Sequence, residues 1–271
     1  MTQNELLIHG AAIGDKKVCI LARDQGATDF SLMLKFGAYN GYREICELAR
    51  EWMLAANQDP TSDIDMMLKC GAYNGHREIC GLACEWGAMS ELALVGAAAG
   101  GQLKLCEMIM CHSLAEFPTT LINRAMNEAA CNGHSQVCEI LYTHEHSLAD
   151  PMLCGAARGG HRAICERARE LGARNFIMML IVGAVANNGE ICELAREWGS
   201  IDESTLMRKE EPGSETVGYM MLRASVTSGN RAIFDLARKW FPNTDISAVL
   251  AGAVDECHRN LVNEWLSESQ A

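Results

Sequence analysis

The chain has few aromatic residues, few prolines and few of the residue runs that make β-strands. Aromatic side chains account for 6% of its 271 residues, and there are 5 prolines. Runs of Val, Ile, Thr and Tyr, which favour strands, are missing, whereas Ala, Leu, Glu and Met, which favour helices, are abundant. The apolar content of 49% is ample for a packed core. The composition therefore predicts an all-α fold and argues against an all-β or βαβ fold.

Positive charge and long apolar runs are also scarce. With 23 Lys+Arg against 35 Asp+Glu, the formal net charge is −12, so no general electrostatic attraction draws the chain to nucleic acid or to an anionic membrane. No apolar run approaches the roughly 18 residues that a membrane span needs, and residues 1–5 lack the basic start of a signal peptide. We expect a cytoplasmic protein that binds neither nucleic acid nor membrane.

Seven of the 13 cysteines recur in one context, of the type Ile-Cys-Glu-Leu-Ala-Arg-Glu-Trp, and they mark a repeat of about 30 residues. These marker cysteines are Cys19, Cys46, Cys80, Cys106, Cys138, Cys165 and Cys192. The pattern continues at Phe234 and Val262, where the cysteine is replaced, which makes about nine units. A period of this length is typical of solenoid proteins.

Three further columns of residues keep register with the marker. Twelve residues before it lies a large apolar residue and nine before it a small one, as in Leu68 and Gly71. Five before it lies glycine, with Asn187 and Cys257 as the exceptions. We interpret the first two columns as the inner face of a short first helix and the glycine as the left-handed residue that ends it, a role for which Asn is next best. An amphipathic second helix then carries the marker.

Two short helices cannot bury both of their faces alone, so neighbouring units must stack. We predict one all-α solenoid of helix-turn-helix repeats over residues 1–271. Repeats one to seven occupy 1–200, an inserted charged loop 201–216, and repeats eight and nine with a C-terminal cap 217–271. The inserted loop is inferred from its charges and from the breakers Pro212 and Gly213.

The third unit, residues 68–88, resembles the ankyrin repeat. Its Gly-His pair recurs at residues 133–134 and 160–161. The resemblance implies an ankyrin-like solenoid, but the Thr-Pro pair of that family is missing and several units have 26 or 27 residues rather than about 33. We therefore expect the β-hairpins to be reduced or absent in the short units. The repeated sequence also resembles repeat arrays of large DNA viruses of amoebae, the marseillevirus group in particular. That resemblance implies a location in the host-cell cytoplasm.

Most of the cysteine, tryptophan, histidine and charged residues have a structural interpretation. We expect the marker cysteines to be small buried apolar residues, because a cytoplasmic chain keeps its thiols reduced. We expect core or shoulder packing for the tryptophans six residues after a marker, which are Trp52, Trp86, Trp198 and Trp240. The ankyrin resemblance implies bonds to neighbouring backbone for His76, His134, His161 and His258. Mixed Arg and Glu on the outer face of the second helix, including Arg50 and Arg169, indicate a solvated face.

A metal site is the open alternative. In units four and five the tryptophan position becomes His112 and His144, with Cys111 and His146 beside them. Stacking brings equivalent positions to about 10 Å, and these ligand types suit Zn²⁺. Two helix ends rarely achieve tetrahedral geometry by accident, so we expect no metal and no other cofactor.

Enzyme motifs such as G-x-x-x-x-G-K-[ST], H-E-x-x-H and G-x-S-x-G are missing. We therefore expect a noncatalytic, monomeric scaffold that binds a protein partner. The ankyrin resemblance implies that residues just before the turning glycine are exposed on a concave first-helix surface. The predicted partner-binding residues are Lys35, Tyr39, Asn40, Lys69, Tyr73, Asn74, Asn132 and Arg158. Tyr, Asn and Arg are typical of interfaces, and the alternative for each position is a merely solvated turn residue.

Two other functions stay open at this point. One is an adaptor that recruits host proteins to ubiquitin ligase machinery, as some viral ankyrin proteins do, although those carry a C-terminal F-box-like module and this chain ends within its ninth repeat. The other is a structural, virion-associated role.

Overall fold

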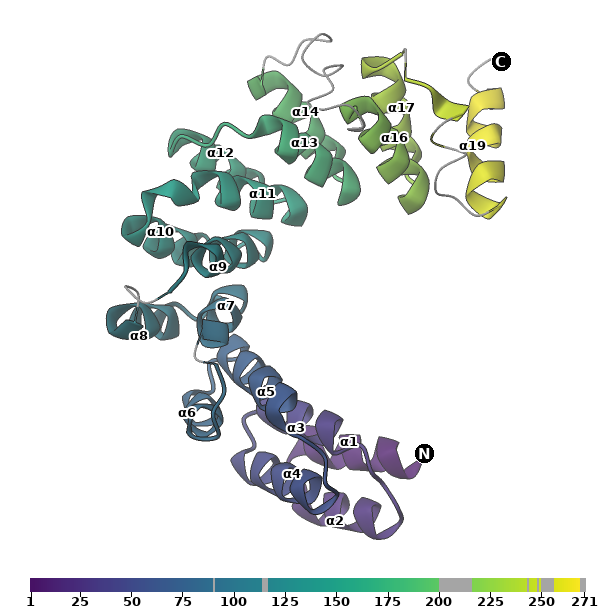
Figure 1. Ribbon diagram of the computed structural model, residues 1–271. Helices are drawn as coiled ribbons and strands as arrows, with labels where there is room; N and C mark the ends of the chain where they lie inside the picture. Colours follow the sequence, from purple (N-terminus) through teal and green to yellow (C-terminus); the bar gives the residue numbers. More distant parts are fainter. Residues whose placement is uncertain are drawn as a thin grey trace. The chain divides into compact units, whose positions relative to one another are not determined.

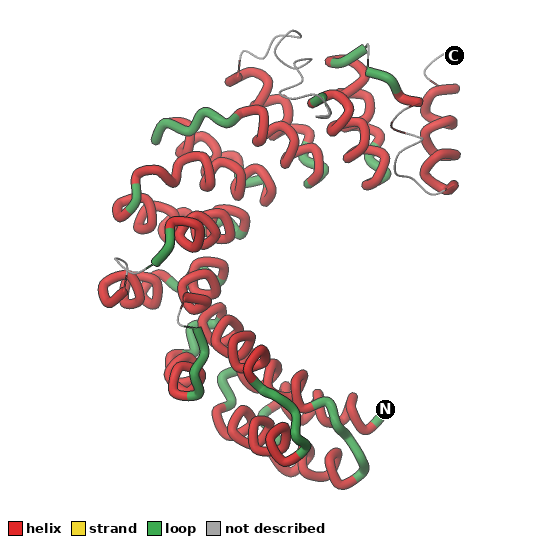
Figure 2. Tube along the Cα trace, in the orientation of Figure 1, coloured by secondary structure: helices red, strands yellow, loops and turns green. Residues whose placement is uncertain are grey.

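The computed structural model describes residues 1–89, 91–113, 117–199, 216–242, 244–247, 249 and 256–268. Every regular element in these ranges is a helix, and none is a strand (Figure 2). The predicted all-α fold is therefore confirmed. The chain divides into two compact units, residues 1–148 and 149–271.

The first unit consists of helix pairs, each made of a first helix and a second helix (Figure 1). The first helices are α1 (Gln3–Ile13), α3 (Phe30–Tyr39), α5 (Thr61–Tyr73), α7 (Glu91–Ala99) and α9 (Thr119–Cys131). The second helices are α2 (Lys16–Asp24), α4 (Arg43–Ala55), α6 (Arg77–Glu85), α8 (Leu103–Ser113) and α10 (Ser135–His144), followed by the 3-10 helix η2 (His146–Leu148). Each first helix packs on its own second helix, and α1, α3, α5 and α7 each also pack on the first helix of the next pair.

The second unit repeats this arrangement. Its first helices are α11 (Ala149–Gly159), α13 (Phe176–Val185) and α16 (Val217–Ser228), and its second helices are α12 (Arg162–Glu170), α14 (Gly189–Gly199), α17 (Arg231–Trp240) and α19 (Glu256–Glu268). The first helices again contact one another in chain order. The charged loop predicted at 201–216 lies outside the described residues except for Thr216, whose side chain caps α16.

The glycine column ends the first helices as the sequence predicts. Its members with positive φ are Gly14, Gly41, Gly75, Gly101, Gly133, Gly160, Gly229 and Asn187. Gly41 has a φ of 78°, and Asn187 has one of 61°. A Cβ atom on Gly41 would lie 2.8 Å from Nδ1 of His76 in the next pair. The position therefore needs glycine for space as well as for backbone conformation.

The marker cysteines lie in the core, which confirms their interpretation as buried apolar residues. Cys46 is fully buried, and its Sγ lies 3.8 Å from the Leu34 carbonyl oxygen on its own first helix. Burial raises the pKa of the Cys46 thiol to about 12. The small column packs beside it: a Cβ on Gly37 would lie 2.8 Å from Cγ2 of Ile45. This close contact explains why the ninth residue before the marker is small.

Candidate functional site

Two of the exposed aromatic residues of the first unit form a pair on neighbouring first helices. Tyr39 and Tyr73 are the last residues of α3 and α5, at equivalent places in their repeats. Their rings stack, with centroids 6.5 Å apart and planes inclined by 23°. Tyr39 is 47% exposed and Tyr73 is 38% exposed. A stacked pair that is open to solvent presents a flat, amphipathic surface.

The backbone beneath these two rings is held by the next pair in each case. Nε2 of His76 donates to the Tyr39 carbonyl oxygen at 3.0 Å, and Nε2 of Gln102 donates to that of Tyr73 at 3.0 Å. Nε2 of His134 makes the same bond with the Ala99 carbonyl oxygen at 3.0 Å. The predicted role of His76 and His134 in bonding neighbouring backbone is confirmed, whereas the His258 side chain lies outside the described residues.

Two lysines accompany the tyrosine pair, one turn earlier on each helix. Lys35 is exposed and Lys69 is half-buried. Burial raises the pKa of the Cys70 thiol, and the positive charges of Lys35 and Lys69 oppose that rise. Both positive charges therefore act on the same thiol. We call Lys35, Tyr39, Lys69, Cys70 and Tyr73 the tyrosine–lysine patch.

The asparagines predicted as partner-binding residues make bonds within their own helices. Nδ2 of Asn40 donates to the Phe36 carbonyl oxygen at 2.9 Å, and Nδ2 of Asn74 donates to that of Cys70 at 3.1 Å. Asn132 makes the equivalent bond at 2.8 Å from the end of α9. Each amide adds a second hydrogen bond to a carbonyl oxygen that the backbone N–H of the same asparagine also bonds. Their local bonds favour the alternative interpretation, a turn residue, so we leave them out of the patch.

Arg158, the last predicted binding residue, is exposed near the end of α11 and belongs to the second unit. Of the eight predicted residues, the structure brings together Lys35, Tyr39, Lys69 and Tyr73. Sequence reasoning missed Cys70, because the effect of Lys35 on its thiol depends on how α3 packs against α5.

The second helices carry a series of Arg–Trp contacts that sequence reasoning also missed. An arginine four residues after one marker lies over the tryptophan six residues after the next. The distances from guanidinium carbon to ring centroid are 4.6 Å for Arg23 and Trp52, 4.7 Å for Arg50 and Trp86, 4.8 Å for Arg169 and Trp198, and 4.9 Å for Arg196 and Trp240. The two columns are visible in the sequence, but their contact requires the stacking of the pairs.

This finding corrects the interpretation of Arg50 as part of a solvated face, whereas Arg169 is exposed as predicted and also lies over Trp198. Arg50 is half-buried, and its Nε atom is buried without a hydrogen-bond partner among the described residues. Packing on Trp86 explains this burial, since guanidinium groups lie flat on aromatic rings. The tryptophan side chains themselves pack as predicted, with Trp52 buried against Phe30.

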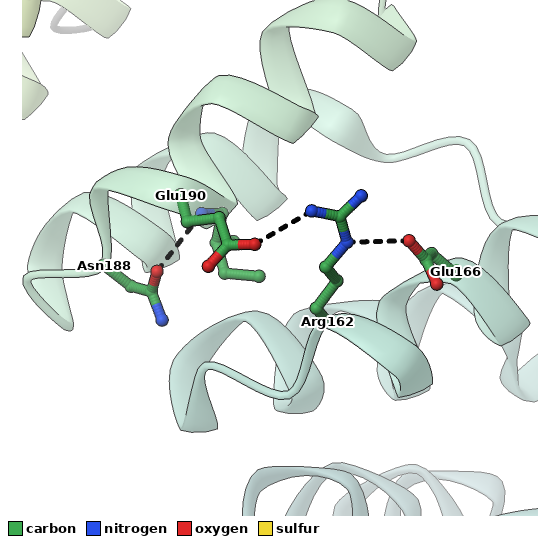
Figure 3. Close-up of polar contacts among 5 residues, drawn as sticks. Arg162, Glu166, Asn188 and Glu190 are labelled. Atoms are coloured by element: carbon green, nitrogen blue, oxygen red, sulfur yellow. Dashed lines mark hydrogen bonds and ion pairs between the residues drawn. The ribbon is translucent and has the colours of Figure 1, made fainter.

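Ion pairs also connect the second helices. In the second unit Nε of Arg162 donates to Glu166 at 2.8 Å, and its Nη1 donates to Glu190 of the next pair at 2.9 Å (Figure 3). Oδ1 of Asn188 accepts from the Ile191 amide at the start of α14 (Figure 3). These side chains are about half exposed, so each pair contributes little stability.

The residues of the zinc alternative lie at or near the ends of α8 and α10. Cys111, His144 and His146 are exposed, and the His146 ring lies edge-on to Tyr142 with a centroid distance of 5.2 Å. The side chain of His112 lies outside the described residues. Among the residues that are described, no group of three His, Cys, Asp or Glu side chains is placed to hold a metal ion.

Comparison with known proteins gives no assignment. No family model matches the chain, and no curated protein matches its sequence. In the described part of the chain, no helix combines the length and the apolar character that crossing a membrane requires.

Proposed function

We propose that this protein is an ankyrin-like solenoid that acts as a noncatalytic interaction scaffold, and that its tyrosine–lysine patch binds a protein partner. The solenoid assignment is supported within each unit by first helices that contact one another in order. It is also supported by the left-handed turns and by side chains that bond the backbone of the preceding pair. These features recur with the sequence repeat, as expected of stacked units.

The exposed stack of Tyr39 on Tyr73 is the observation that carries the choice of surface. Tyrosine loses little conformational entropy on binding and covers a large area, which is why it is enriched among residues that dominate binding energy. The backbone hydrogen bonds from His76 and Gln102 hold both tyrosines in place before a partner arrives. Preorganisation of this kind lowers the cost of association.

The charge beside the rings indicates the chemistry of the partner. Lys35 and Lys69 put two positive charges on the patch, in a chain whose net charge is −12. A partner segment in which acidic side chains lie next to an apolar side chain is complementary to this surface. Opposite charges across an interface speed association and select the partner.

The test uses the wild-type protein and three variants as parallel baits. Tyr39→Ala and Tyr73→Ala remove the two rings, and Leu54→Ala on α4 removes an exposed apolar side chain that is 49% exposed. We expect a partner that the wild type and Leu54→Ala retain and that both tyrosine variants lose. Each tyrosine variant should then cost about 1–2 kcal/mol of binding free energy in a titration with that partner. Retention by both tyrosine variants, with loss in Leu54→Ala, would show that the second-helix face binds instead.

A further inference from the structure

The junction around Arg162 shows how charge is balanced between neighbouring second helices. Arg162 lies three residues before its marker, and it binds Glu166, one residue after the marker, at 2.8 Å. It also binds Glu190, which lies two residues before the next marker, at 2.9 Å (Figure 3). One guanidinium therefore faces a carboxylate on its own helix and another on the next second helix.

The junction between α6 and α8 lacks both of these carboxylates. Arg77 holds the place that corresponds to Arg162, but Gly81 stands one residue after the marker and Lys104 stands two residues before the next one. Within the part of the chain that the structure describes, the Arg77 side chain has no hydrogen bond or ion pair. At these three positions the junction carries two positive charges, where its counterpart carries one positive and two negative charges.

The acidic residues of α6 lie toward the other neighbour. The bond to Glu47 raises the pKa of the Arg43 guanidinium on α4, and the negative charges of Glu85 and Glu78 raise it further. Their negative charges therefore act at the junction between α4 and α6. The Arg–Trp contact is interrupted here as well, because Cys84 replaces the arginine four residues after the marker.

A cavity of about 310 Å³ lies between α6 and α8. Its apolar wall includes Leu68, Leu105, Met108, Ile109 and Phe117. Gly81 and Cys84 line it from α6, and Arg77 is the charged residue of the lining. Cys84 and Met108 are exposed, so the cavity opens to solvent.

Cavities at two other second-helix junctions have a different character. The cavity between α12 and α14 is lined by Glu166, Arg169, Glu170 and Arg174, which carry both signs of charge. The cavity between α14 and α17 is lined by Glu190, Glu193, Asp235 and Lys239. Among its described lining residues, the α6–α8 cavity instead combines an apolar wall with one cation and no carboxylate.

We propose that this cavity is a binding site for a small amphipathic carboxylate. The carboxylate of the ligand takes the place of the missing glutamate on Arg77, whose planar guanidinium matches it with two parallel hydrogen bonds. The apolar body of the ligand lies against the wall between α6 and α8. Small-molecule sites typically combine an apolar lining with a few such polar groups. From Arg77 to Cys84 the cavity follows α6 for about 10 Å, a length that suits a medium-chain acid.

The experiment uses the full-length protein and octanoate as the probe, with 1-octanol, octylamine and acetate as matched compounds. Calorimetric titration measures binding, and alkylation of Cys84, followed by mass spectrometry, reports occupancy of the cavity. We expect octanoate to bind and to slow Cys84 alkylation. We expect octanol, octylamine and acetate to bind at least about tenfold more weakly, since each lacks the head group or the apolar body.

Substitutions at Gly81 separate charge from folding. A Cβ on Gly81 meets nothing within 4 Å, so Gly81→Glu and Gly81→Ala are both accommodated. Gly81→Glu supplies the missing carboxylate four residues from Arg77, and we expect it to weaken octanoate binding about tenfold or more, whereas Gly81→Ala changes it less than about threefold. Arg77→Gln should match Gly81→Glu, and Arg162→Gln in the second unit should match the wild type.

Three outcomes would overturn the proposal. The first is no binding and no protection of Cys84 by octanoate. The second is equal affinity for octanoate and octanol, which would mean that Arg77 does not recognise a carboxylate. The third is equal octanoate binding by Gly81→Glu and Gly81→Ala.

Discussion

The residue seven positions before the marker lies at or next to the end of the first helix. In the first four repeats this position holds Ala12, Tyr39, Tyr73 and Ala99, so a ring projects from two neighbouring repeats among these four. The repeat places these rings at stacking distance, with centroids 6.5 Å apart. Because the periodic backbone places equivalent positions side by side, Tyr39 and Tyr73 form one exposed aromatic surface.

Glycine has opposite roles at two positions, and substitution by alanine should distinguish them. Gly41 has a φ of 78°, and a Cβ there would lie 2.8 Å from the His76 ring. We expect Gly41→Ala to destabilise the protein by about 1–2 kcal/mol. Gly81 lies inside α6 with open space around it, and Gly81→Ala should stabilise by about 0.5–1 kcal/mol.

Urea unfolding of both variants beside the wild type measures the two effects. A loss of stability in Gly81→Ala, or none in Gly41→Ala, would contradict the assigned backbone roles.

Neighbouring second helices are joined by side chains more than by close backbone packing, which is concentrated among the first helices. The arginine of one second helix covers the tryptophan of the next, as Arg50 covers Trp86 at 4.7 Å. The long apolar stem of arginine also packs when its charged group lies on a ring. These contacts therefore stabilise the stacking of the pairs on the side where neighbouring backbones pack less closely.

A double-mutant cycle tests the Arg50–Trp86 contact. We expect Arg50→Ala and Trp86→Leu, measured alone and together by chemical denaturation, to show a coupling energy of about 0.5–1 kcal/mol. The matched control combines Arg50→Ala with Trp198→Leu, because Trp198 packs under Arg169 instead. Additive behaviour in the first cycle, or coupling in the control cycle, would refute the contact as a source of stability.

Buried thiols run through the core of both units. Burial raises the pKa of Cys46, Cys106, Cys138, Cys165 and Cys192 from an ordinary 9.0 to about 12. Unfolded thiols ionise near pH 9, while the native thiols stay protonated until about pH 12. Their contribution to stability is therefore complete below pH 9 and is lost as pH rises toward 12.

This linkage predicts that the free energy of unfolding falls steeply with pH between 9 and 11. Removing one buried thiol by Cys46→Ala should make that slope shallower by up to about 1.4 kcal/mol per pH unit. Cys106→Ala should act similarly, and the double variant should show the sum of both changes. Urea unfolding at several pH values provides the slope, and an unchanged slope in all three variants would exclude the thiols as its source.

The sequence alone was sufficient for features that depend on local conformation and on burial. The left-handed turn at Asn187 follows from its place in the glycine column, because few other residues tolerate positive φ. The burial of Cys46 follows from its place on the apolar arc of a helix. The all-α fold follows from composition and period together, since both determine the structure within a single repeat.

Contacts between neighbouring repeats were decided by the tertiary structure. Arg50 belongs to a charged surface pattern, yet it lies on Trp86, which is 36 positions further along the chain. Asn40 has an interface-type side chain, but its amide is used within its own helix. The cavity beside Gly81 also depends on how α6 and α8 face each other. Period and hydropathy determine which face of a helix is buried, whereas the distance and rotation between stacked pairs determine which side chains meet.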